Sequence, residues 1–479
     1  MIKNILIMLL AAALAASLYR HQPLELPTVK SPELVPVKPN PEPEPKSPSK
    51  FEKLHQWLAE SLQEPDFQGA ALGFCLLDPQ GQVVVDHHAE TACIPASSLK
   101  TVTTATALEK LGPEFQIVTT LSSTAIAVDG TISGNLVIRG GGDPMLSMAD
   151  LQSWAADLKN RGIHQIKGDI IGDGRLFEGS IYDDFWNWGD IGNGYGSAVS
   201  GLNLEHNRFT ATFRAGATLG SATQLLGVHP AMPGVDGINE TVTAAEDSGD
   251  GVMIHGGERT ALLHFRGTVP LGRAQFQVQG AVPDPEAFAA HHFKEALLTE
   301  GIEVTGVALP VGQRQVTASH ELLKHHSPPL KAIVTSIHAT SDNHETECLF
   351  RLLGLRENLP PDVVIRQHWQ MRGLNFMGLR MVDGCGLARA DHIRPVDLAR
   401  LQFLAARGTQ GLVYQDSLLS KAGLRWKGGA MSGVRSTTGY VTNFIGQEYC
   451  FAFMVNHYRD GSAVASLRDA LIQKIRELQ

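Results

Sequence analysis

A serine and a lysine that stand three positions apart, Ser97 and Lys100, are the first candidates for catalytic chemistry. Residues three apart share one face of a helix, so the hydroxyl and the amine can meet there. A serine hydroxyl becomes a strong nucleophile when a base takes its proton, and a lysine acts as that base when burial and a second cation lower its pKa. The helix N-terminus also favours a developing anion. The pattern is short, and a solvated helix start is the alternative interpretation.

Two further motifs follow in the same chain. Ser341-Asp342-Asn343 lies between two apolar helical segments and presents a hydroxyl and an amide on the same side of a short loop. Lys427-Gly428-Gly429 is predicted on an edge strand, where glycines let a ligand backbone approach closely. A serine with its lysine, then S-x-N, then a lysine with a following glycine is the three-motif pattern of penicillin-interacting serine enzymes.

The elements that must position these motifs are helices and strands in mixed order. Apolar residues at helical spacing predict a helix from Pro95 to Leu111, and apolar runs predict strands near both ends of the chain. Between 114 and 316, short strands alternate with turn signals and helical periodicity is sparse. We therefore expect an α/β (α+β) catalytic domain made of 51–113 and 317–479, interrupted by a β-rich insertion of two subdomains.

Composition narrows the functional classes. The formal net charge is −9 and the chain has no run of Lys or Arg, which argues against sequence-independent binding of nucleic acid. Five cysteines occur without C-x-x-C spacing, so an odd thiol must stay unpaired within one chain. The histidine pairs lack the carboxylate-spaced partners of a metal motif. We therefore expect neither a metal nor a cofactor.

The N-terminus predicts export. Residues 1–18 combine a short basic start, an apolar run and an A-x-A site, which is typical of a secretory signal, with an uncleaved membrane anchor as the alternative. Residues 19–50 are rich in proline and charge and predict an extended linker. The catalytic part would then be periplasmic, with a possible tether to the membrane.

The chain resembles the class C low-molecular-mass penicillin-binding proteins, which are D-alanyl-D-alanine carboxypeptidases/endopeptidases of the periplasm. The resemblance includes the landmarks Gly140-Gly141-Gly142-Asp143-Pro144 and Asp383-Gly384-Cys385-Gly386-Leu387. The long interval between Ser97 and Ser341 also resembles this family, which inserts extra domains there. The resemblance implies a serine β-lactamase/transpeptidase-like catalytic domain, in which helices flank an antiparallel sheet.

The resemblance also implies a role for each motif residue. Ser97 would attack the penultimate D-alanine carbonyl and Lys100 would be its base. Ser341 would relay the proton to the leaving amine, and Asn343 would orient Lys100 and the substrate amide. Lys427 would hold negative charge and depress the pKa of Lys100.

The remaining assignments concern substrate binding. The backbone N–H groups of Ser97 and Ala430 would form the oxyanion hole, and Gly428 and Gly429 would contact the substrate. Asp143 is a candidate substrate contact, although its Gly-Asp-Pro setting favours a turn residue.

Two departures from the family pattern stand out. Gly428 replaces the usual Thr or Ser, whose hydroxyl helps bind the terminal carboxylate, and Cys385 stands where Ser is expected. Two hypotheses therefore remain: an active serine peptidase of peptidoglycan stem peptides that β-lactams acylate, and a weak or inactive relative that binds peptidoglycan or a protein partner. A β-lactamase or an esterase is a third, less favoured interpretation.

Overall fold

The computed structural model describes residues 48–312 and 314–479. The predicted signal or anchor (1–18) and nearly all of the predicted linker (19–50) lie outside these residues. At the linker's end, Ser49 caps the first described helix, α2 (Lys50–Ser61), through a capping box. Within the two described ranges, no helix is both long and apolar enough to cross a membrane.

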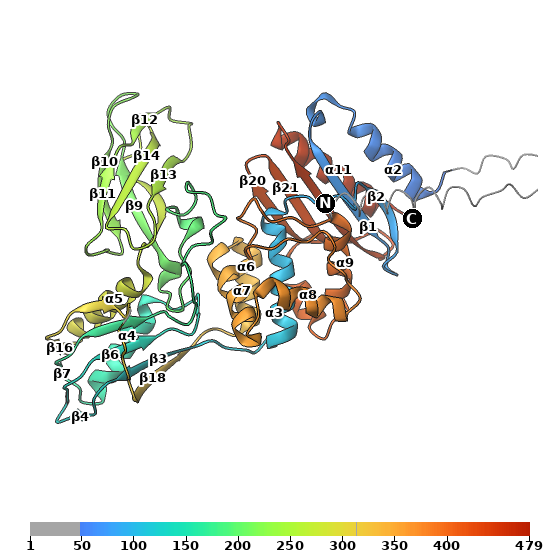
Figure 1. The fold of residues 1–479 in the computed structure, drawn as a ribbon. Helices are drawn as coiled ribbons and strands as arrows, with labels where there is room; N and C mark the ends of the chain where they lie inside the picture. Colours follow the sequence, from blue (N-terminus) through green and yellow to red (C-terminus); the bar gives the residue numbers. More distant parts are fainter. Residues whose placement is uncertain (1–47, 313) are drawn as a thin grey trace, which may run out of the picture. The chain divides into compact units, whose positions relative to one another are not determined.

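A six-stranded antiparallel sheet joins the two ends of the chain (Figure 1). Its central strand β22 is buried along almost its whole length, which explains its continuous apolar sequence. The early strand β1 pairs with β22, so segments almost 400 residues apart in sequence lie side by side. The strand order is β19 (Leu419–Lys421), β20 (Leu424–Met431), β21 (Val434–Thr442), β22 (Glu448–Asn456), β1 (Ala71–Leu77) and β2 (Val83–His87).

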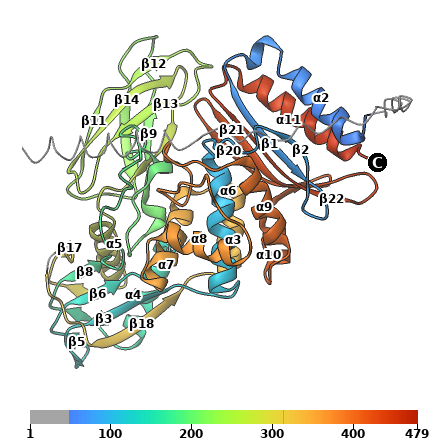
Figure 2. The same cartoon turned by 45° about the vertical axis from the view of Figure 1, so that its right-hand side comes forward.

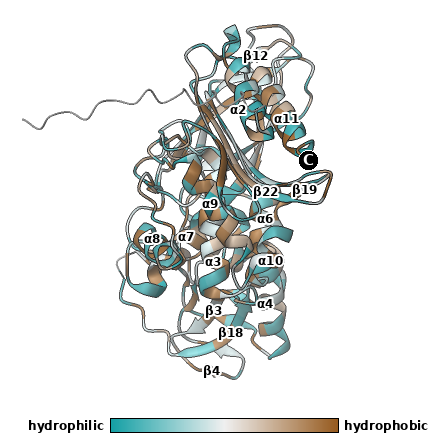
Figure 3. Cartoon of the chain, turned by 90° about the vertical axis from the view of Figure 1, so that its right-hand side faces the viewer, coloured by the Kyte–Doolittle hydropathy of each residue, from teal (hydrophilic) through white to brown (hydrophobic). Residues whose placement is uncertain are grey.

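Helices cover both faces of this sheet. On one face, α2 and α11 (Gly461–Arg476) lie side by side and pack their apolar sides on the strands (Figure 2). Figure 3 shows that the strands are mainly hydrophobic, whereas α2 and α11 carry hydrophilic residues on their outer sides. A larger apolar core fills the other face. The helices there are α3 (Lys100–Leu111), α6 (Leu330–Thr340), α7 (Asn343–Glu357), α8 (Pro361–Met371), α9 (Pro395–Ala406) and α10 (Gly411–Ser417).

Helix α3 is the centre of this helical layer. A short 3₁₀ turn, η2 (Ala96–Leu99), leads into it, and Gly112 ends it with a positive φ of 84°. Every residue from Lys100 to Leu108 is buried, including four threonines. Their hydroxyls are satisfied by backbone carbonyls; Thr103, for example, donates to Gly384 at 2.7 Å. The helix can therefore carry polar groups through the core.

The segment between the two halves of this layered structure contains four further sheets and two helices that the sequence analysis did not predict, α4 (Met148–Asn160) and α5 (Pro285–Thr299). One group of sheets packs on α4 and α5, and a second group comprises β9 to β15 (Figure 1). The last strand of the first group, β18 (His320–His326), pairs with β3. We therefore propose that the insertion ends after β18 rather than at residue 316. Its other strands are β3 (Val118–Ser123), β4 (Ala127–Val128), β5 (Thr131–Ile132), β6 (Leu136–Arg139), β7 (Gln165–Ile166), β8 (Ile170–Asp173), β9 (Arg208–Arg214), β10 (Gln224–His229), β11 (Asp236–Asn239), β12 (Val242–Ala244), β13 (Gly251–His255), β14 (Leu262–Pro270), β15 (Phe276–Ala281), β16 (Glu303–Val304) and β17 (Ala308–Pro310).

The strands around the third motif differ from the pattern in the sequence. The sequence predicts a strand pair at 431–437 and 439–444, but 434–442 form the single strand β21. The turn lies at Gly433, whose φ is +71°. Gly439 instead sits inside the ladder, where a Cβ would overlap the carbonyl oxygen of Arg425 on β20. The glycine marks a close approach of two backbones rather than a turn.

Gly439→Ala should therefore destabilise the protein more than Gly433→Ala. The first change forces two paired strands apart, at about 3 kcal/mol, whereas the second only places alanine in a left-handed turn, at about 1 kcal/mol. Urea unfolding of both variants checks the order. Equal losses would contradict the assignment of Gly439 to the strand interior.

Candidate active site

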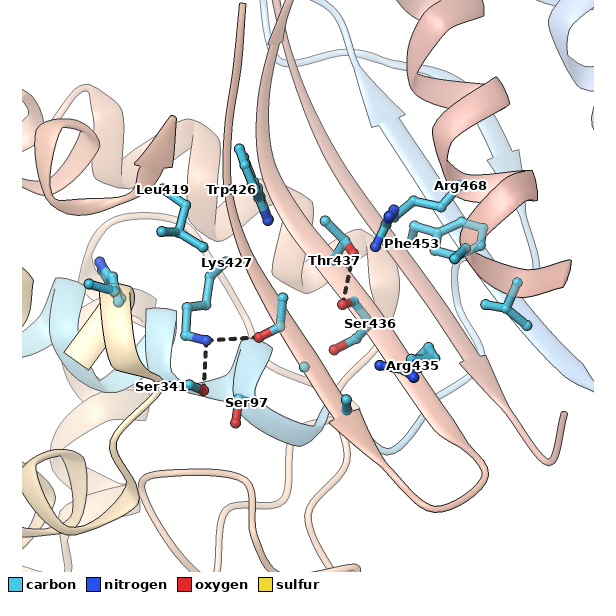
Figure 4. Close-up of a pocket in the computed structure, with 17 residues that line it drawn as sticks. Ser97, Ser341, Leu419, Trp426, Lys427, Arg435, Ser436, Thr437, Phe453 and Arg468 are labelled. Atoms are coloured by element: carbon cyan, nitrogen blue, oxygen red, sulfur yellow. Dashed lines mark hydrogen bonds between the residues drawn. The ribbon is translucent and has the colours of Figure 1, made fainter. Parts of the chain in front are cut away.

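The structure brings the three motifs together around one cavity of about 520 Å³ (Figure 4). Ser97 comes from η2, Ser341 from the end of α6, and Lys427 from β20. The elements meet because η2 packs against β20 and β21, where the hydroxyl of Ser436 donates to the Pro95 carbonyl. The three segments are distant in sequence, but all of them line the same cavity.

Lys100 lies directly behind the cavity and is fully buried. Its Nζ donates to Ser97 Oγ at 2.9 Å, to Asn343 Oδ1 at 2.6 Å and to the Cys385 carbonyl at 2.7 Å. Burial lowers the pKa of Lys100 below its ordinary value, against the opposing effect of nearby acidic groups such as Asp383. Of the two causes that the sequence analysis expected, burial and a second cation, burial is the one that lowers the pKa of Lys100.

Lys427 forms a second, almost completely buried ammonium site. Its Nζ donates to Ser341 Oγ at 2.8 Å and to the Gly428 carbonyl at 2.8 Å (Figure 4). Burial, followed by repulsion from Lys100, lowers the pKa of Lys427 to about 7. Two lysines with lowered pKa values therefore flank the hydroxyls of Ser97 and Ser341.

The S-x-N motif is the junction of two helices. Ser341 ends α6 in a left-handed conformation, with φ 61° and ψ 34°, and Asp342 caps α7 by accepting from the Glu345 N–H at 2.9 Å. This turn directs the Ser341 hydroxyl at Lys427 and the side-chain amide oxygen of Asn343, Oδ1, at Lys100. The two residues of the motif thus contact different lysines.

The insertion also holds this junction, a role that no sequence motif indicated. Arg208 lies 2.7 Å from Asp342, and the Asn343 Nδ2 donates to the Tyr195 carbonyl at 2.8 Å. Although burial raises it, the Arg208 guanidinium is the main reason that the pKa of Asp342 falls to about 2. His206 pairs with Glu345 at 2.9 Å. We regard these insertion residues as positioning residues for the second motif.

The two glycines of the third motif differ in their surroundings. A Cβ at Gly429 would lie 2.7 Å from the Ser97 nitrogen and 2.8 Å from the Pro95 carbonyl, so only glycine fits there. A Cβ at Gly428 would meet only the Ser436 carbonyl, at 3.8 Å. The space for a side chain at 428 is therefore open, and Ala430 lines the cavity beside it.

The loop that contains Cys385 fixes the third acceptor of Lys100. Asp383 Oδ1 accepts from the N–H groups of Cys385 and Gly386 at 2.9 and 2.6 Å, and its Oδ2 accepts from Trp186 Nε1 at 2.8 Å. Burial raises the pKa of the Cys385 thiol, which keeps it protonated. The contribution of this residue to the site is its backbone carbonyl, which accepts from Lys100. All five cysteines are buried and unpaired.

Asp143 is the one predicted contact that the structure does not bring to the cavity. Its side chain is buried, accepts from the Met145 N–H at 2.8 Å and lies 3.3 Å from His325. The residue stabilises a turn and an ion pair inside the insertion, which is the alternative that its Gly-Asp-Pro setting favoured.

Two groups of possible metal ligands are already engaged by protein donors. Within each group the ligand atoms lie within 4.8 Å of one another. Arg208 neutralises the first group, and backbone N–H groups and Arg351 occupy the carboxylates of the second. Hydrogen bonds and ion pairs thus account for both: His206, Asp342 and Glu345; and Glu347, Asp383 and Cys385.

The chain is similar to known D-Ala-D-Ala carboxypeptidases. Residues 54–423 match the model of the D-Ala-D-Ala carboxypeptidase 3 (S13) family. D-alanyl-D-alanine carboxypeptidase DacB of Haemophilus influenzae is 27% identical over 444 residues, which cover 86% of this chain and 91% of the relative. A D-alanyl-D-alanine carboxypeptidase of an Actinomadura species is 26% identical over 472 residues, covering 90% and 86%.

The fold is shared with a solved structure. The crystal structure of penicillin-binding protein 4 from Haemophilus influenzae superposes with a TM-score of 0.77 at 24% identity, covering 88% of this chain and 99% of that one. The predicted fold class, an antiparallel sheet flanked by helices with a long insertion, is therefore confirmed. Taken with the family match over most of its length, the chain belongs to the D-Ala-D-Ala carboxypeptidase 3 (S13) family of serine peptidases.

Proposed function

We propose that this protein is a periplasmic serine D-Ala-D-Ala carboxypeptidase/endopeptidase that cleaves peptidoglycan stem peptides and is acylated by β-lactams. The observation that carries the proposal is the 2.9 Å hydrogen-bond distance between the buried Lys100 Nζ and Ser97 Oγ. A buried lysine with a lowered pKa is the base that a serine nucleophile requires. The family match supports the same chemistry.

Acylation follows from this contact. Ser97 Oγ attacks the carbonyl carbon of the penultimate D-alanine while Lys100 takes the hydroxyl proton. Negative charge then develops on the carbonyl oxygen, and the N–H groups of Ser97 and Ala430 stabilise it. Donors of this kind contribute about 3–4 kcal/mol to transition-state stabilisation.

Collapse of the tetrahedral intermediate breaks the C–N bond. The proton passes through Ser341, which accepts a hydrogen bond from Lys427, to the leaving amine. The charged form of Lys427 also attracts the substrate carboxylate. Asn343 contributes by holding Lys100, and Gly429 by letting the substrate approach Ser97. Water then hydrolyses the acyl bond to Ser97 and releases the enzyme.

The compartment is part of the same proposal. The apolar segment at 1–18 and the proline-rich segment at 19–50 support export, with the catalytic part held away from the membrane if the segment stays uncleaved. A cell-wall substrate is reached from that side of the membrane.

Fluorescent penicillin should label the wild-type protein covalently. The label should disappear in Ser97→Ala and fall strongly in Lys100→Ala, because the first removes the nucleophile and the second its base. Ser98→Ala is the matched control, since Ser98 is buried and its hydroxyl donates to the Pro95 carbonyl at 2.8 Å. Loss of labelling in Ser98→Ala with retention in Ser97→Ala would overturn the assignment.

The acylation rate should depend on pH in two directions. It should rise with pH as Lys100 loses its proton and becomes a base, and fall above about pH 7 as Lys427 loses the charge that attracts a carboxylate. Because Lys100 and Lys427 repel each other, the rising and the falling part of the pH profile report on the two lysines together. Stopped-flow acylation checks the profile, and Lys427→Arg should remove the falling limb because arginine stays charged. A flat profile from about pH 5 to 9 would contradict a lysine base.

Gly428→Thr should increase carboxypeptidase activity on a D-Ala-D-Ala pentapeptide by about tenfold or more. A hydroxyl that binds a carboxylate contributes about 1.5–3 kcal/mol, and the space beside Gly428 accepts the side chain. Gly428→Ala is the control without a hydroxyl and should not increase the rate. Release of D-alanine measures both.

The same assay separates the active enzyme from the weak relative that Gly428 alone suggests. An efficient wild-type enzyme with an unchanged Gly428→Thr rate would mean that another donor already binds the carboxylate. No hydrolysis of any muropeptide by either form would favour the weak or inactive relative.

A further inference from the structure

A second cavity, of about 380 Å³, continues the catalytic cavity along the sheet. The two share Trp426 of β20, Thr437 of β21 and Arg468 of α11 as a common wall. Figure 4 shows Arg468 extending from α11 toward Thr437. From this wall the second cavity follows α11 to Arg476 and β20 back to Leu424, so the two cavities adjoin at these three side chains.

The second cavity is cationic. Lys421, Arg468 and Arg476 line it, and Asp469 is its acidic lining residue. Asp469 is well exposed and pairs with Arg468 at 2.7 Å, and such exposed pairs exchange partners at little cost. The Arg476 guanidinium stacks on Phe444, with its centre 4.8 Å from the ring centroid. A planar, supported guanidinium is well suited to bind a carboxylate through two hydrogen bonds.

The direction of the substrate determines which part of it reaches this cavity. The proposed oxyanion donor Ala430 lies near the end of β20. Lys427 lies three residues before it and, in the proposed mechanism, faces the leaving amine and its carboxylate. Trp426 and Leu424 share the face of β20 that carries Gly428 and is turned toward α11, opposite to the Lys427 side chain, and they follow the strand away from Ser97. Because a strand rises about 3.4 Å per residue, Leu424 lies about 10 Å beyond Lys427. A single D-alanine ends near Lys427, whereas a larger leaving group continues into the second cavity.

We propose that the groove lined by Lys421, Arg468 and Arg476 binds the carboxylates of a large leaving group, namely the amine-donating strand of a cross-linked stem peptide. The inference rests on the proposed function and adds a second binding region to it. The reaction stays balanced: water cleaves one amide, Ser97 carries the acyl half, and the leaving strand departs as a free amine. Its remaining carboxylates provide the negative charge that the groove recognises.

The test compares a cross-linked muropeptide dimer with a linear D-Ala-D-Ala pentapeptide, using the full chain. Lys421→Ala/Arg476→Ala should lower kcat/KM for the dimer relative to the pentapeptide by about tenfold, through KM. Arg425→Ala is the matched control. It removes one cation from the same strand, but Arg425 alternates with Leu424 and Trp426 and lies 3.7 Å from Asp416. Its ratio should stay at the wild-type value.

A change in the substrate supplies an independent arm. Amidating the carboxylates of the leaving strand should lower the dimer-to-pentapeptide ratio of kcat/KM for the wild-type protein to that of the double variant. The ratio for the double variant itself should not change. Titration with fluorescent penicillin gives the concentration of active enzyme in each sample, so misfolding does not enter the ratio. A wild-type protein that no penicillin labels would contradict the proposed function itself. Normal labelling with an unchanged dimer-to-pentapeptide ratio in the double variant would overturn only the groove.

Discussion

The Lys100 ammonium group is charged and has no contact with solvent. Its hydrogen-bonding needs determine how the helical layer around the cavity must be arranged. A buried ammonium must find an acceptor for each of its three protons. Ser97, Asn343 and the Cys385 carbonyl supply them, and they come from a 3₁₀ turn, a helix start and a loop. Each of these three segments must therefore be held within a few tenths of an ångström. The buried helix α3, the Asp383 loop and the ion pairs of the insertion serve that requirement.

The electrostatics of the site follow from having two such lysines. Burial lowers the pKa of Lys100 and of Lys427, and mutual repulsion lowers that of Lys427 further. Among residues 48–312 and 314–479, neither lysine makes a salt bridge with a carboxylate; their hydrogen-bond partners are hydroxyl, amide and backbone oxygens. In the proposed mechanism a neutral Lys100 is the base, and burial is what makes this neutral form available.

The sequence predicted the parts of the site that side-chain type and spacing encode. Ser97 with Lys100, Ser341 with Asn343, and Lys427 were assigned from motifs. In the structure Ser97, Ser341 and Lys427 line one cavity, and Lys100 and Asn343 are hydrogen-bonded to each other behind it. The Cys385 and Tyr195 carbonyls were not assigned, because a backbone oxygen leaves no mark on residue type. Arg208 was missed because its partner, Asp342, is 134 positions away and nothing local signals the pair.

The fold was predicted with the same strengths and weaknesses. The apolar runs that form β1, β22 and α11 are long and were recognised, whereas α4 and α5 lie among turn signals that suggested only strands. Helix α5 does begin with an Asp284 cap and Pro285, a helix-start signal that was available in the sequence. The break predicted between 437 and 439 lies inside β21, and the turn lies at Gly433, a residue that the prediction placed within a strand.

At position 341 the residue type that best suits the backbone differs from the one that provides a hydroxyl, because Ser341 has a left-handed conformation. A residue that ends a helix with positive φ is best as glycine, and a side chain there costs about 1 kcal/mol. Serine supplies the hydroxyl that Lys427 contacts, so the protein retains the less stable residue at this place. Directed evolution for heat resistance alone would favour glycine at 341, which lacks the hydroxyl that the proposed mechanism uses. Selection schemes for this scaffold must therefore score turnover together with thermal tolerance.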